Sequence, residues 1–399
     1  MTNHSVLIAG AGPVGLTAAL VLADAGVAVK VFEAGDDVEE DLRASTFHPP
    51  TLDMLERFGI TADLIAQGLI CPHWQVRLHP TGERAVFDLS VLEGETRHPY
   101  RLQSEQWKLS RALLARLKGM PRAELRVGAR AIAVAQDDTG VHLTIESRGQ
   151  SETLRGAWLI GADGARSVVR KAIGLEFEGR TYPETTLLAT TRFPFEEHLE
   201  GLSKVSYCWK AGGNFSLLKV PGRWRVSIYP REDMPMEEQL ARANIEAALQ
   251  DIVPRKAPYE VLEVRPYRVH QRIVDRYRVG RVFLAGDAAH VNSPAGGMGM
   301  NGGVHDAFNL AEKLAAVALG RADKSLLDLY DLQRRPVARE QILAQSDSNR
   351  ARMREKDDTK RRALLADMQA LIADRSRLKA HLMKTSMIEG LRQAARITG

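Results

Sequence analysis

The segment VLIAGAGPVGLTAAL, residues 6–20, decides the fold, because an apolar strand pattern turns into a helix pattern across a few glycines. Ser5 to Ala9 predicts a short buried strand, Pro13 to Ala25 predicts a helix, and Val27 to Phe32 predicts a second apolar strand that ends at Glu33. A strand, a helix and a strand in this order form a βαβ unit, in which helices cover a parallel sheet. We therefore expect an α/β fold with a doubly wound domain.

The glycines of this segment, Gly10, Gly12 and Gly15, follow the G-x-G-x-x-G spacing. They permit a tight turn, the approach of a pyrophosphate to the backbone and close packing of the helix on the strand, and the helix N-terminus offers N–H donors. Glu33 ends the second strand, where its carboxylate can accept a hydrogen bond from a ribose hydroxyl. The motif predicts nucleotide binding and leaves NAD and FAD open. The alternative is a tight strand–helix turn without a ligand.

Composition places the chain among globular proteins: 399 residues, 44% hydrophobic and 26% charged, enough for two domains. It has no run of about 18 apolar residues, and the first strand pattern begins too early for a signal peptide. Cys71 and Cys208 offer neither a disulfide framework nor metal-ligand spacing, and the net charge of +5 comes without a basic stripe interleaved with aromatic residues. We expect a cytoplasmic protein that binds no metal, membrane or nucleic acid.

Residues 177–265 differ from the flanking sequence. The short alternating runs KVSYCWK, NFSLLKV and RWRVSIYP are typical of an antiparallel sheet, and a helix is predicted at Pro235 to Leu249. The pattern of a strand followed by a helix returns at GRVFLAGDAAH, and after Pro336 apolar residues recur at helical spacing. The expected parts are a discontinuous nucleotide-binding domain (residues 1–70, 101–176 and 266–340), a substrate domain (71–100 and 177–265) and a helical C-terminal region (341–399).

Other local patterns fill in the first domain. Thr51 to Phe58 predicts a helix that stops at Gly59, and Gln103 to Leu117 predicts another. Val127 to Val134 and Val141 to Ser147 predict paired strands around a turn.

Two more strand-end turns accompany the first glycine motif. GADGARSVVR, residues 161–170, places Asp163 and Gly164 after a strand, and GDAAH, residues 286–290, places Asp287 after another. A plain dehydrogenase has no use for these turns. Their order and spacing resemble the class A flavoprotein aromatic hydroxylases, the para-hydroxybenzoate hydroxylase-like family, up to about residue 340. The resemblance implies a glutathione reductase-like Rossmann domain that binds FAD, an inserted antiparallel substrate domain and a helical tail.

The resemblance also implies which residues hold FAD. Asp287 would bind the ribityl chain, and the Asp163 turn would serve both FAD and the transient nicotinamide cofactor. Arg43 falls where such enzymes carry an arginine over the flavin side of the pyrophosphate; otherwise it is a surface arginine near a helix start. Gln103 matches a flavin-contacting polar position at which many relatives have arginine.

Residues 294–301 fit the family pattern P-x-G-G-x-G-x-N. Here glycines would let the backbone lie flat against the isoalloxazine, where a Cβ would collide. A helix from Gly303 to about Leu319 would point its positive N-terminus at the N1–C2=O edge of the reduced flavin. Pro294 would stiffen the turn that faces flavin and substrate. The residues so assigned are Pro294, Gly296, Gly297, Gly299, Met300 and Asn301.

Substrate residues are expected on the second sheet. By alternation Tyr207 shares a face of its strand with Val205 and Trp209, and Phe215 shares one with Leu217. Each of these faces either lines the substrate site or belongs to the ordinary core of the sheet. Tyr207 is the candidate polar contact to a substrate hydroxyl. Arg225 would steer a carboxylate or a nicotinamide phosphate, or else is a surface charge. The basic run from Arg350 to Arg362 is a solvated helix face or a dimer contact.

His48 is the candidate base at a turn, and a structural hydrogen-bonding role is the alternative for it and for His290. The resemblance implies a monooxygenase that uses NADH or NADPH and O₂ to hydroxylate a phenol-like or N-heteroaromatic compound through a flavin C4a-hydroperoxide, with a homodimer possible. Baeyer–Villiger-type or other flavin oxygenation and a non-catalytic FAD-binding protein stay open. A flavin-dependent halogenase is disfavoured because its W-x-W-x-I-P stretch is absent.

Overall fold

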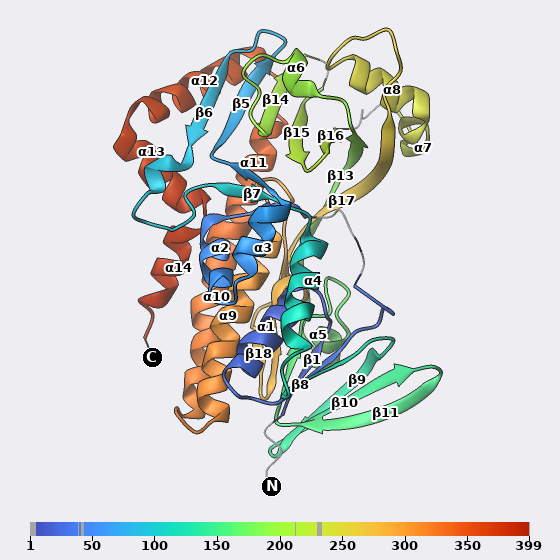
Figure 1. Ribbon diagram of the computed structural model, residues 1–399, viewed down its shortest axis with the longest axis vertical. Coiled ribbons are helices and arrows are strands. Elements are labelled where there is room, and N and C mark those ends of the chain that lie inside the picture. The colour runs from blue at the N-terminus through green and yellow to red at the C-terminus, as the bar shows by residue number, and fades with distance from the viewer. Residues whose placement is uncertain (1–4, 39, 41–43, 212, 230–233, 399) are drawn as a thin grey trace.

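The computed structural model describes residues 5–38, 40, 44–211, 213–229 and 234–398. Its lower half in Figure 1 is built on a six-stranded sheet in the order β18-β19-β12-β1-β2-β8. All neighbours pair in parallel except β18 and β19, which are antiparallel at the edge. The strands are β1 (Val6–Ala9), β2 (Val29–Phe32), β8 (Ala123–Arg126), β12 (Trp158–Gly161), β18 (Arg278–Val279) and β19 (Val282–Leu284).

Helix α1 (Pro13–Asp24) is almost wholly buried, because it packs against both α9 (Gly299–Ala318) and α4 (Gln106–Leu117). A Cβ on Gly303 of α9 would lie 2.6 Å from the Val14 side chain, so the glycines of α9 permit this close crossing. A separate three-stranded antiparallel sheet, β9 (Arg130–Asp137), β10 (Gly140–Ser147) and β11 (Gln150–Gly156), contacts the main sheet through β10 and β12. The short helix α5 (Val168–Ala172) follows β12.

The upper half of Figure 1 holds an eight-stranded, mainly antiparallel sheet in the order β20-β17-β13-β16-β15-β14-β5-β6. The long strands β13 (Glu178–Thr191) and β17 (Val261–Ile273) run down from it toward the lower half. The other strands are β5 (His73–His79), β6 (Arg84–Asp88), β14 (Val205–Lys210), β15 (Phe215–Val220), β16 (Arg223–Ile228) and β20 (His290–Val291). Helices α6 (Phe195–His198), α7 (Met236–Leu240) and α8 (Arg242–Gln250) lie at this end.

A small sheet joins the two halves. It consists of β3 (Thr46–Phe47), β7 (Arg101–Gln103) and β4 (Leu69–Cys71), with helices α2 (Pro49–Glu56) and α3 (Ile60–Gln67) between β3 and β4. Because β5 follows β4 directly, this sheet leads the chain from one half into the other.

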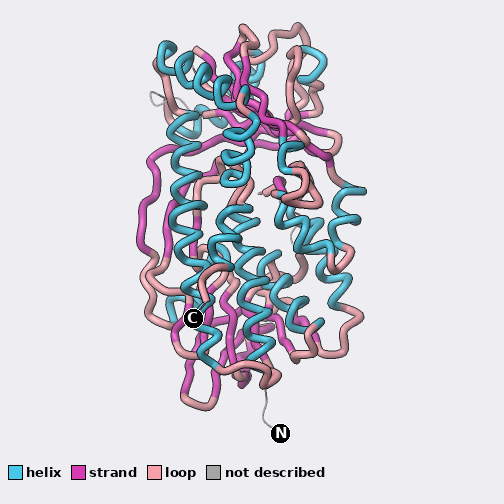
Figure 2. Tube along the Cα trace, turned by 90° about the vertical axis from the view of Figure 1, so that its left-hand side faces the viewer, coloured by secondary structure: helices cyan, strands magenta, loops and turns pink. Residues whose placement is uncertain are grey.

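The C-terminal helices run the length of the molecule, as the side view in Figure 2 shows. Helix α12 packs on β6, and α14 packs on α10. Within the described residues no helix is long and apolar enough to cross a bilayer. These helices are α10 (Asp328–Val337), α11 (Ala344–Met353), α12 (Asp358–Ala373), α13 (Arg375–Thr385) and α14 (Ile388–Ala395).

This architecture confirms the predicted α/β class with an antiparallel second sheet and a helical C-terminal region. Helix α9 begins at Gly299 and not at Gly303, because packing on α1 outweighs the low helix propensity of glycine. The predicted helix from Gln103 starts only at Gln106, after the strand β7. The helix predicted at Pro235 to Leu249 is broken at Ala241, which has an extended ψ of 137°. Division into domains stays a prediction.

Candidate active site

The first glycine turn forms a cradle at the carboxyl end of β1. Gly10 has φ of +101°, and a Cβ there would lie 2.4 Å from the Ala162 carbonyl oxygen; a Cβ on Gly15 would lie 2.0 Å from the Gly10 oxygen. Nothing lies within 4 Å of a Cβ placed on Gly12. Gly10 and Gly15 are therefore required by packing, while Gly12 leaves the backbone of the α1 N-terminus open to a ligand, as an FAD pyrophosphate needs.

Glu33 lies beside this cradle at the end of β2. Its Oε2 accepts a hydrogen bond from the Ala11 N–H at 2.7 Å, and its Oε1 accepts from the Gly35 N–H at 2.9 Å. A carboxylate oxygen has a second lone pair, so each can also accept from a ribose hydroxyl. Arg43, expected near the pyrophosphate, lies outside the described residues.

The Asp163 carboxylate caps the following helix. It accepts from Ser167 Oγ at 2.5 Å, from the Val168 N–H at 2.7 Å and from the Val169 N–H at 3.1 Å. Arg170 of the same motif donates to the carbonyls of Ala165 (2.9 Å) and Ala288 (3.0 Å). The motif thus joins the middle turn to the GDAAH turn. The structural role of Arg170 was not predicted, because its partner is distant in sequence.

A buried ionic cluster braces the GDAAH turn against α9. Asp306 Oδ1 pairs with Arg334 Nε at 2.8 Å, and Oδ2 pairs with His290 Nε2 at 2.9 Å and accepts from the Gly286 N–H at 3.2 Å. Burial would raise the pKa of Asp306, but Arg334 and His290 outweigh burial and hold that pKa below its usual value. His290 therefore has the structural role, and the exposed Asp287 is carried on a rigid turn.

The second glycine loop lies against β3. Gly297 donates its N–H to the Pro294 carbonyl at 3.0 Å, and its φ is +68°. A Cβ on Gly297 would lie 2.8 Å from Thr46 Cβ, and a Cβ on Gly299 would lie 2.9 Å from Asn292 Oδ1. Pro294 is exposed at the start of this turn. The flavin-facing role of this loop stays a prediction.

Asn301 fixes this loop with its whole side chain. Its Oδ1 accepts from the His48 N–H (2.9 Å) and Thr51 Oγ1 (2.7 Å), and its Nδ2 donates to the carbonyls of Thr46 (2.8 Å) and Gly297 (2.7 Å). With these four bonds made, the Asn301 side chain positions the loop; its neighbour Met300 is partly exposed at the start of α9.

His48 differs from the expected catalytic base. It is fully buried, and its Nε2 donates to the Gly296 carbonyl at 2.8 Å. Burial and the nearby Arg101 lower the pKa of His48 to about 3, although the Gly296 carbonyl acts in the other direction. A neutral imidazole committed to Gly296 fits the structural alternative: His48 holds the glycine loop.

Gln103 lies on β7 beside the same loop and is fully buried. Its Nε2 donates to Thr46 Oγ1 at 2.8 Å, while its Oε1 has no hydrogen-bond partner among the described residues. A buried unpaired acceptor next to the loop is consistent with a ligand contact.

A pocket opens between the glycine loop and the upper sheet. Its walls come from elements far apart in sequence, because the small sheet and the C-terminal helices meet over the loop. The lining includes Trp74, Arg101, Tyr207, Gly296, Arg352 and His381. Tyr207 and Gly296 were expected here. The four others were not, since no local pattern marks them.

Phe215 and Leu217 are not part of the pocket. In the β14–β15 pairing they stand opposite Cys208 and Ser206, whereas Tyr207 stands opposite Ser216. Both are buried in an apolar core with Trp224 and Leu249, on the other face of the sheet. Arg225 is also no surface charge: it is 5% exposed and donates to Ser45 Oγ at 2.8 Å.

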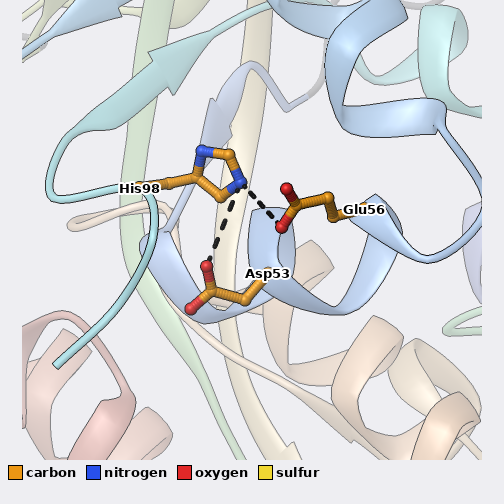
Figure 3. A group of neighbouring side chains, drawn as sticks. All are labelled: Asp53, Glu56 and His98. Atoms are coloured by element: carbon orange, nitrogen blue, oxygen red, sulfur yellow. Dashed lines mark ion pairs between the residues drawn. The ribbon is translucent and has the colours of Figure 1, made fainter. Parts of the chain in front are cut away.

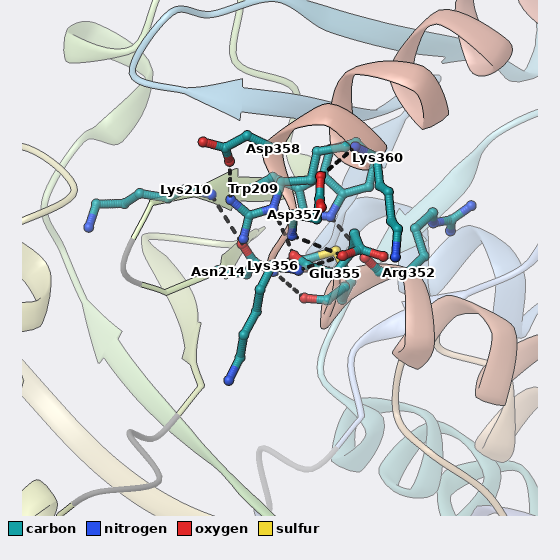
Figure 4. A network of polar contacts seen from close by, with 11 residues as sticks. Trp209, Lys210, Asn214, Arg352, Glu355, Lys356, Asp357, Asp358 and Lys360 are labelled. Atoms are coloured by element: carbon teal, nitrogen blue, oxygen red, sulfur yellow. Dashed lines mark hydrogen bonds and ion pairs between the residues drawn. The ribbon is translucent and has the colours of Figure 1, made fainter.

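The turn after α11 is fastened to the β14–β15 hairpin (Figure 4). Trp209 Nε1 donates to the Arg352 carbonyl at 2.9 Å, and Asn214 Nδ2 donates to the Met353 carbonyl. Arg361 is 4% exposed and donates to Asn214 Oδ1 at 3.0 Å. The interpretation of Arg350 to Arg362 as a solvated face is therefore wrong for Arg361, and this network fixes the backbone at Arg352.

Asp53, Glu56 and His98 form a cluster (Figure 3), with potential ligand atoms within 4.8 Å of one another. Asp53 already accepts from Thr96 Oγ1 (2.6 Å), and Glu56 pairs with Arg97 at 2.8 Å. His98 Nε2 is 3.4 Å from Glu56 Oε2. These contacts tie the segment before Arg101 to α2.

Comparison with known proteins agrees with this geometry. The FAD binding domain family matches residues 3–345. The chain is 37% identical over 401 residues to para-nitrophenol 4-monooxygenase of Pseudomonas sp. (strain WBC-3), covering 98% of this chain and 97% of that one. It is 37% identical over 334 residues to 6-hydroxy-3-succinoylpyridine 3-monooxygenase of Pseudomonas putida (strain S16), covering 84% of each.

The crystal structure of p-nitrophenol 4-monooxygenase from Pseudomonas putida DLL-E4 superposes with a TM-score of 0.89 at 34% identity, covering 97% of each chain. Both the sequence match and the fold extend through the C-terminal helices that close the pocket. The chain therefore belongs to the FAD binding domain family and is an FAD-dependent aromatic-ring monooxygenase.

Proposed function

We propose that this protein hydroxylates a phenol-like or N-heteroaromatic ring in the pocket between the glycine loop of residues 294–301 and the upper sheet. The observation that carries the proposal is that one loop serves both halves: Gly296 lines the pocket, while Gly299 begins α9, which packs on the α1 of the nucleotide cradle. A ring in the pocket would lie directly over the loop. The named relatives act on a nitrophenol and a hydroxypyridine, the two ring classes expected here.

The balanced reaction is ArH + O₂ + NAD(P)H + H⁺ → ArOH + H₂O + NAD(P)⁺. FAD, when bound, would supply the redox chemistry that links the nicotinamide to O₂. Either NADH or NADPH is the proposed donor. Homodimerisation and a cytoplasmic location stay predictions.

The chain's own residues would bind FAD and orient the substrate ring. Gly12 and the α1 N-terminus would take the pyrophosphate, Glu33 a ribose, and Asp287 the ribityl chain. The first turn of α9 would offer backbone N–H groups to negative charge on the flavin ring. Trp74 and Tyr207, whose rings are edge-to-face at 6.0 Å, would hold the substrate ring. The C-terminal helices would exclude water from above.

Two experiments test this proposal. Aromatic acids, phenols and hydroxypyridines should be screened for stimulated NAD(P)H oxidation, with ¹⁸O₂ to follow label into the ring product. If FAD is reduced but no compound gains ¹⁸O, ring hydroxylation is excluded. Asp287→Ala should purify without its yellow colour, while the exposed control Asp328→Ala should keep it; a fully yellow, active Asp287→Ala protein would refute the ribityl assignment.

A further inference from the structure

Two arginines face the pocket without a carboxylate partner. Arg101 is 4% exposed, and Arg352, on α11, is partly buried. Within the described residues neither guanidinium has a carboxylate in ion-pair range, and the Nε atoms of both are buried without a hydrogen-bond partner. Among the residues that the structure describes, Arg352 Nη2 donates only to the neutral Asn349 Oδ1, at 2.8 Å. Burying a cation without a counter-charge is unfavourable in general, so the arrangement calls for a reason.

The other polar groups of the pocket do not neutralise this charge. Trp74 stacks under the Arg101 guanidinium at 5.1 Å, and its Nε1 has no hydrogen-bond partner among the described residues. His381 Nε2 is likewise unpaired there. Burial, with Arg352 and Arg101 nearby, lowers the pKa of His381 to about 4, so this ring is neutral at pH 7. The pocket therefore gathers hydrogen-bond donors and positive charge around one space.

The two arginines are also held in place. Arg101 lies on β7, just after the Asp53–Glu56–His98 cluster, and its guanidinium is beside the Tyr207 hydroxyl. The Arg352 carbonyl accepts from Trp209 Nε1 at 2.9 Å, within the network that fastens α11 to the upper sheet. Cations fixed in this way are preorganised for one anion and lose little freedom on binding.

We propose that Arg101 and Arg352 form an anion subsite that selects aromatic substrates carrying an ionised oxygen substituent on the ring. This deepens the proposed function, on which it rests. The shared chemistry is a ring-borne anionic oxygen group, which a carboxylate or a phenolate can supply. Guanidinium groups donate charge-assisted hydrogen bonds to either. Occupation of the subsite would also turn the ring in the pocket so that a defined carbon faces the glycine loop.

The test is equilibrium binding to the FAD-loaded enzyme without NAD(P)H, followed by the change in flavin absorbance. Two matched ligand pairs separate the sources of the anion: benzoate against benzamide, and 4-nitrophenol against 4-nitroanisole at pH 8. Wild-type enzyme should bind the ionised member of at least one pair ten or more times more tightly. Discrimination in the first pair identifies a carboxylate, and in the second a phenolate. Equal binding within both pairs would overturn the proposal.

Variants of the two arginines test whether these residues cause the preference for ionised ligands. Arg101→Gln and Arg352→Gln should each weaken the ionised ligand at least about tenfold and leave the neutral one within threefold, as loss of a charge-assisted bond implies. Arg352→Lys should restore part of the preference. Arg362→Gln, an exposed arginine of the same segment that pairs with Glu83 at 3.1 Å, is the matched control and should bind as wild type does. If both Gln variants keep the wild-type preference for the ionised ligand, the assignment of the anion subsite to Arg101 and Arg352 is refuted.

Stability gives an independent readout. If the arginines serve a ligand and not the fold, the melting temperature of ligand-free Arg352→Gln should be unchanged or raised, because a strained buried charge is removed. A fall of several degrees with unchanged ligand preference would mean a structural role and overturn the proposal. None of these readouts needs turnover, so an anion preference without ¹⁸O incorporation would refute the proposed hydroxylation and leave the subsite standing.

Discussion

The molecule buries arginine in two contrasting ways. Arg334 and Asp306 are both fully buried and paired at 2.8 Å, with His290 on the second carboxylate oxygen. In the pocket above, Arg101 and Arg352 have no such partner among the described residues. At Arg334 the chain supplies the counter-charge itself. At Arg101 and Arg352 we infer that the anion comes from outside.

The largest expected effect is on the paired side of this contrast. Asp306→Asn leaves Arg334 buried without a counter-charge and should lower the free energy of unfolding by about 3–5 kcal/mol, measured by urea denaturation at pH 7. Asp328→Asn, which breaks the exposed pair with Arg278, is the control and should cost less than about 1 kcal/mol. A loss below 1 kcal/mol in Asp306→Asn would show that the buried pair does not support the fold.

The same pair has a defined pH dependence. The folded-state pKa of Asp306 lies below its unfolded value, so its contribution is present above about pH 4 and is lost as the pH falls through the folded pKa. Wild-type protein should therefore lose its advantage over Asp306→Asn below pH 4. A difference that persists unchanged to pH 2 would contradict the lowered pKa.

Between the two regions lies the glycine loop, and Gly297→Val tests whether it serves chemistry or only folding. Valine would be strained at φ of +68° and would collide with Thr46. Gly222→Val is the control, because φ is +73° there and no atom lies near the added Cβ. Gly222→Val should lose about 1–3 kcal/mol of stability through backbone strain, and Gly297→Val more, because of its added collision with Thr46. Only Gly297→Val should also lose more than tenfold in turnover or fail to retain FAD; equal turnover in both would refute the flavin-facing assignment.

The sequence predicted what is local in this molecule. The strand at Trp158 to Gly161 was placed correctly, and β1 and β2 nearly so, because glycine turns and apolar runs mark them directly. Helix α3 was not predicted, because Gly59, with φ of +70°, is a stop signal for α2 but also stands at the N-terminus of α3.

The pocket could not be predicted in the same way. Arg101 and Arg352 meet only because β7 and α11 approach in space, and nothing near either residue marks it as buried. Alternation found Tyr207 but misplaced Phe215 and Leu217, because the register between two strands decides which face a residue occupies, and a shift of one residue reverses it.

Per pH unit, a smaller effect should come from His48. Burial lowers its folded pKa to about 3, below the unfolded value near 6.5, so the unfolded state binds more protons between these values. The stability this group contributes is present above pH 6.5 and falls by up to about 1.4 kcal/mol per pH unit as the pH drops toward 3. His48→Gln should flatten this slope, and the exposed control His73→Gln should not. An unchanged slope in His48→Gln would contradict a buried neutral imidazole.

The smallest effect is expected for Tyr207→Phe, which compares the contribution of a neutral hydroxyl to ligand binding with that of a charged guanidinium. Tyr207→Phe keeps the ring edge-to-face with Trp74 and removes only the hydroxyl beside Arg101. One neutral hydrogen bond is worth about 1 kcal/mol, so ionised ligands should bind no more than about tenfold more weakly, less than the loss in Arg101→Gln. Tyr182→Phe, on β13, should leave binding unchanged. If Tyr207→Phe costs more than Arg101→Gln, the phenol and not the unpaired guanidinium supplies the binding energy, and the contrast between the two buried arginine sites no longer explains the pocket.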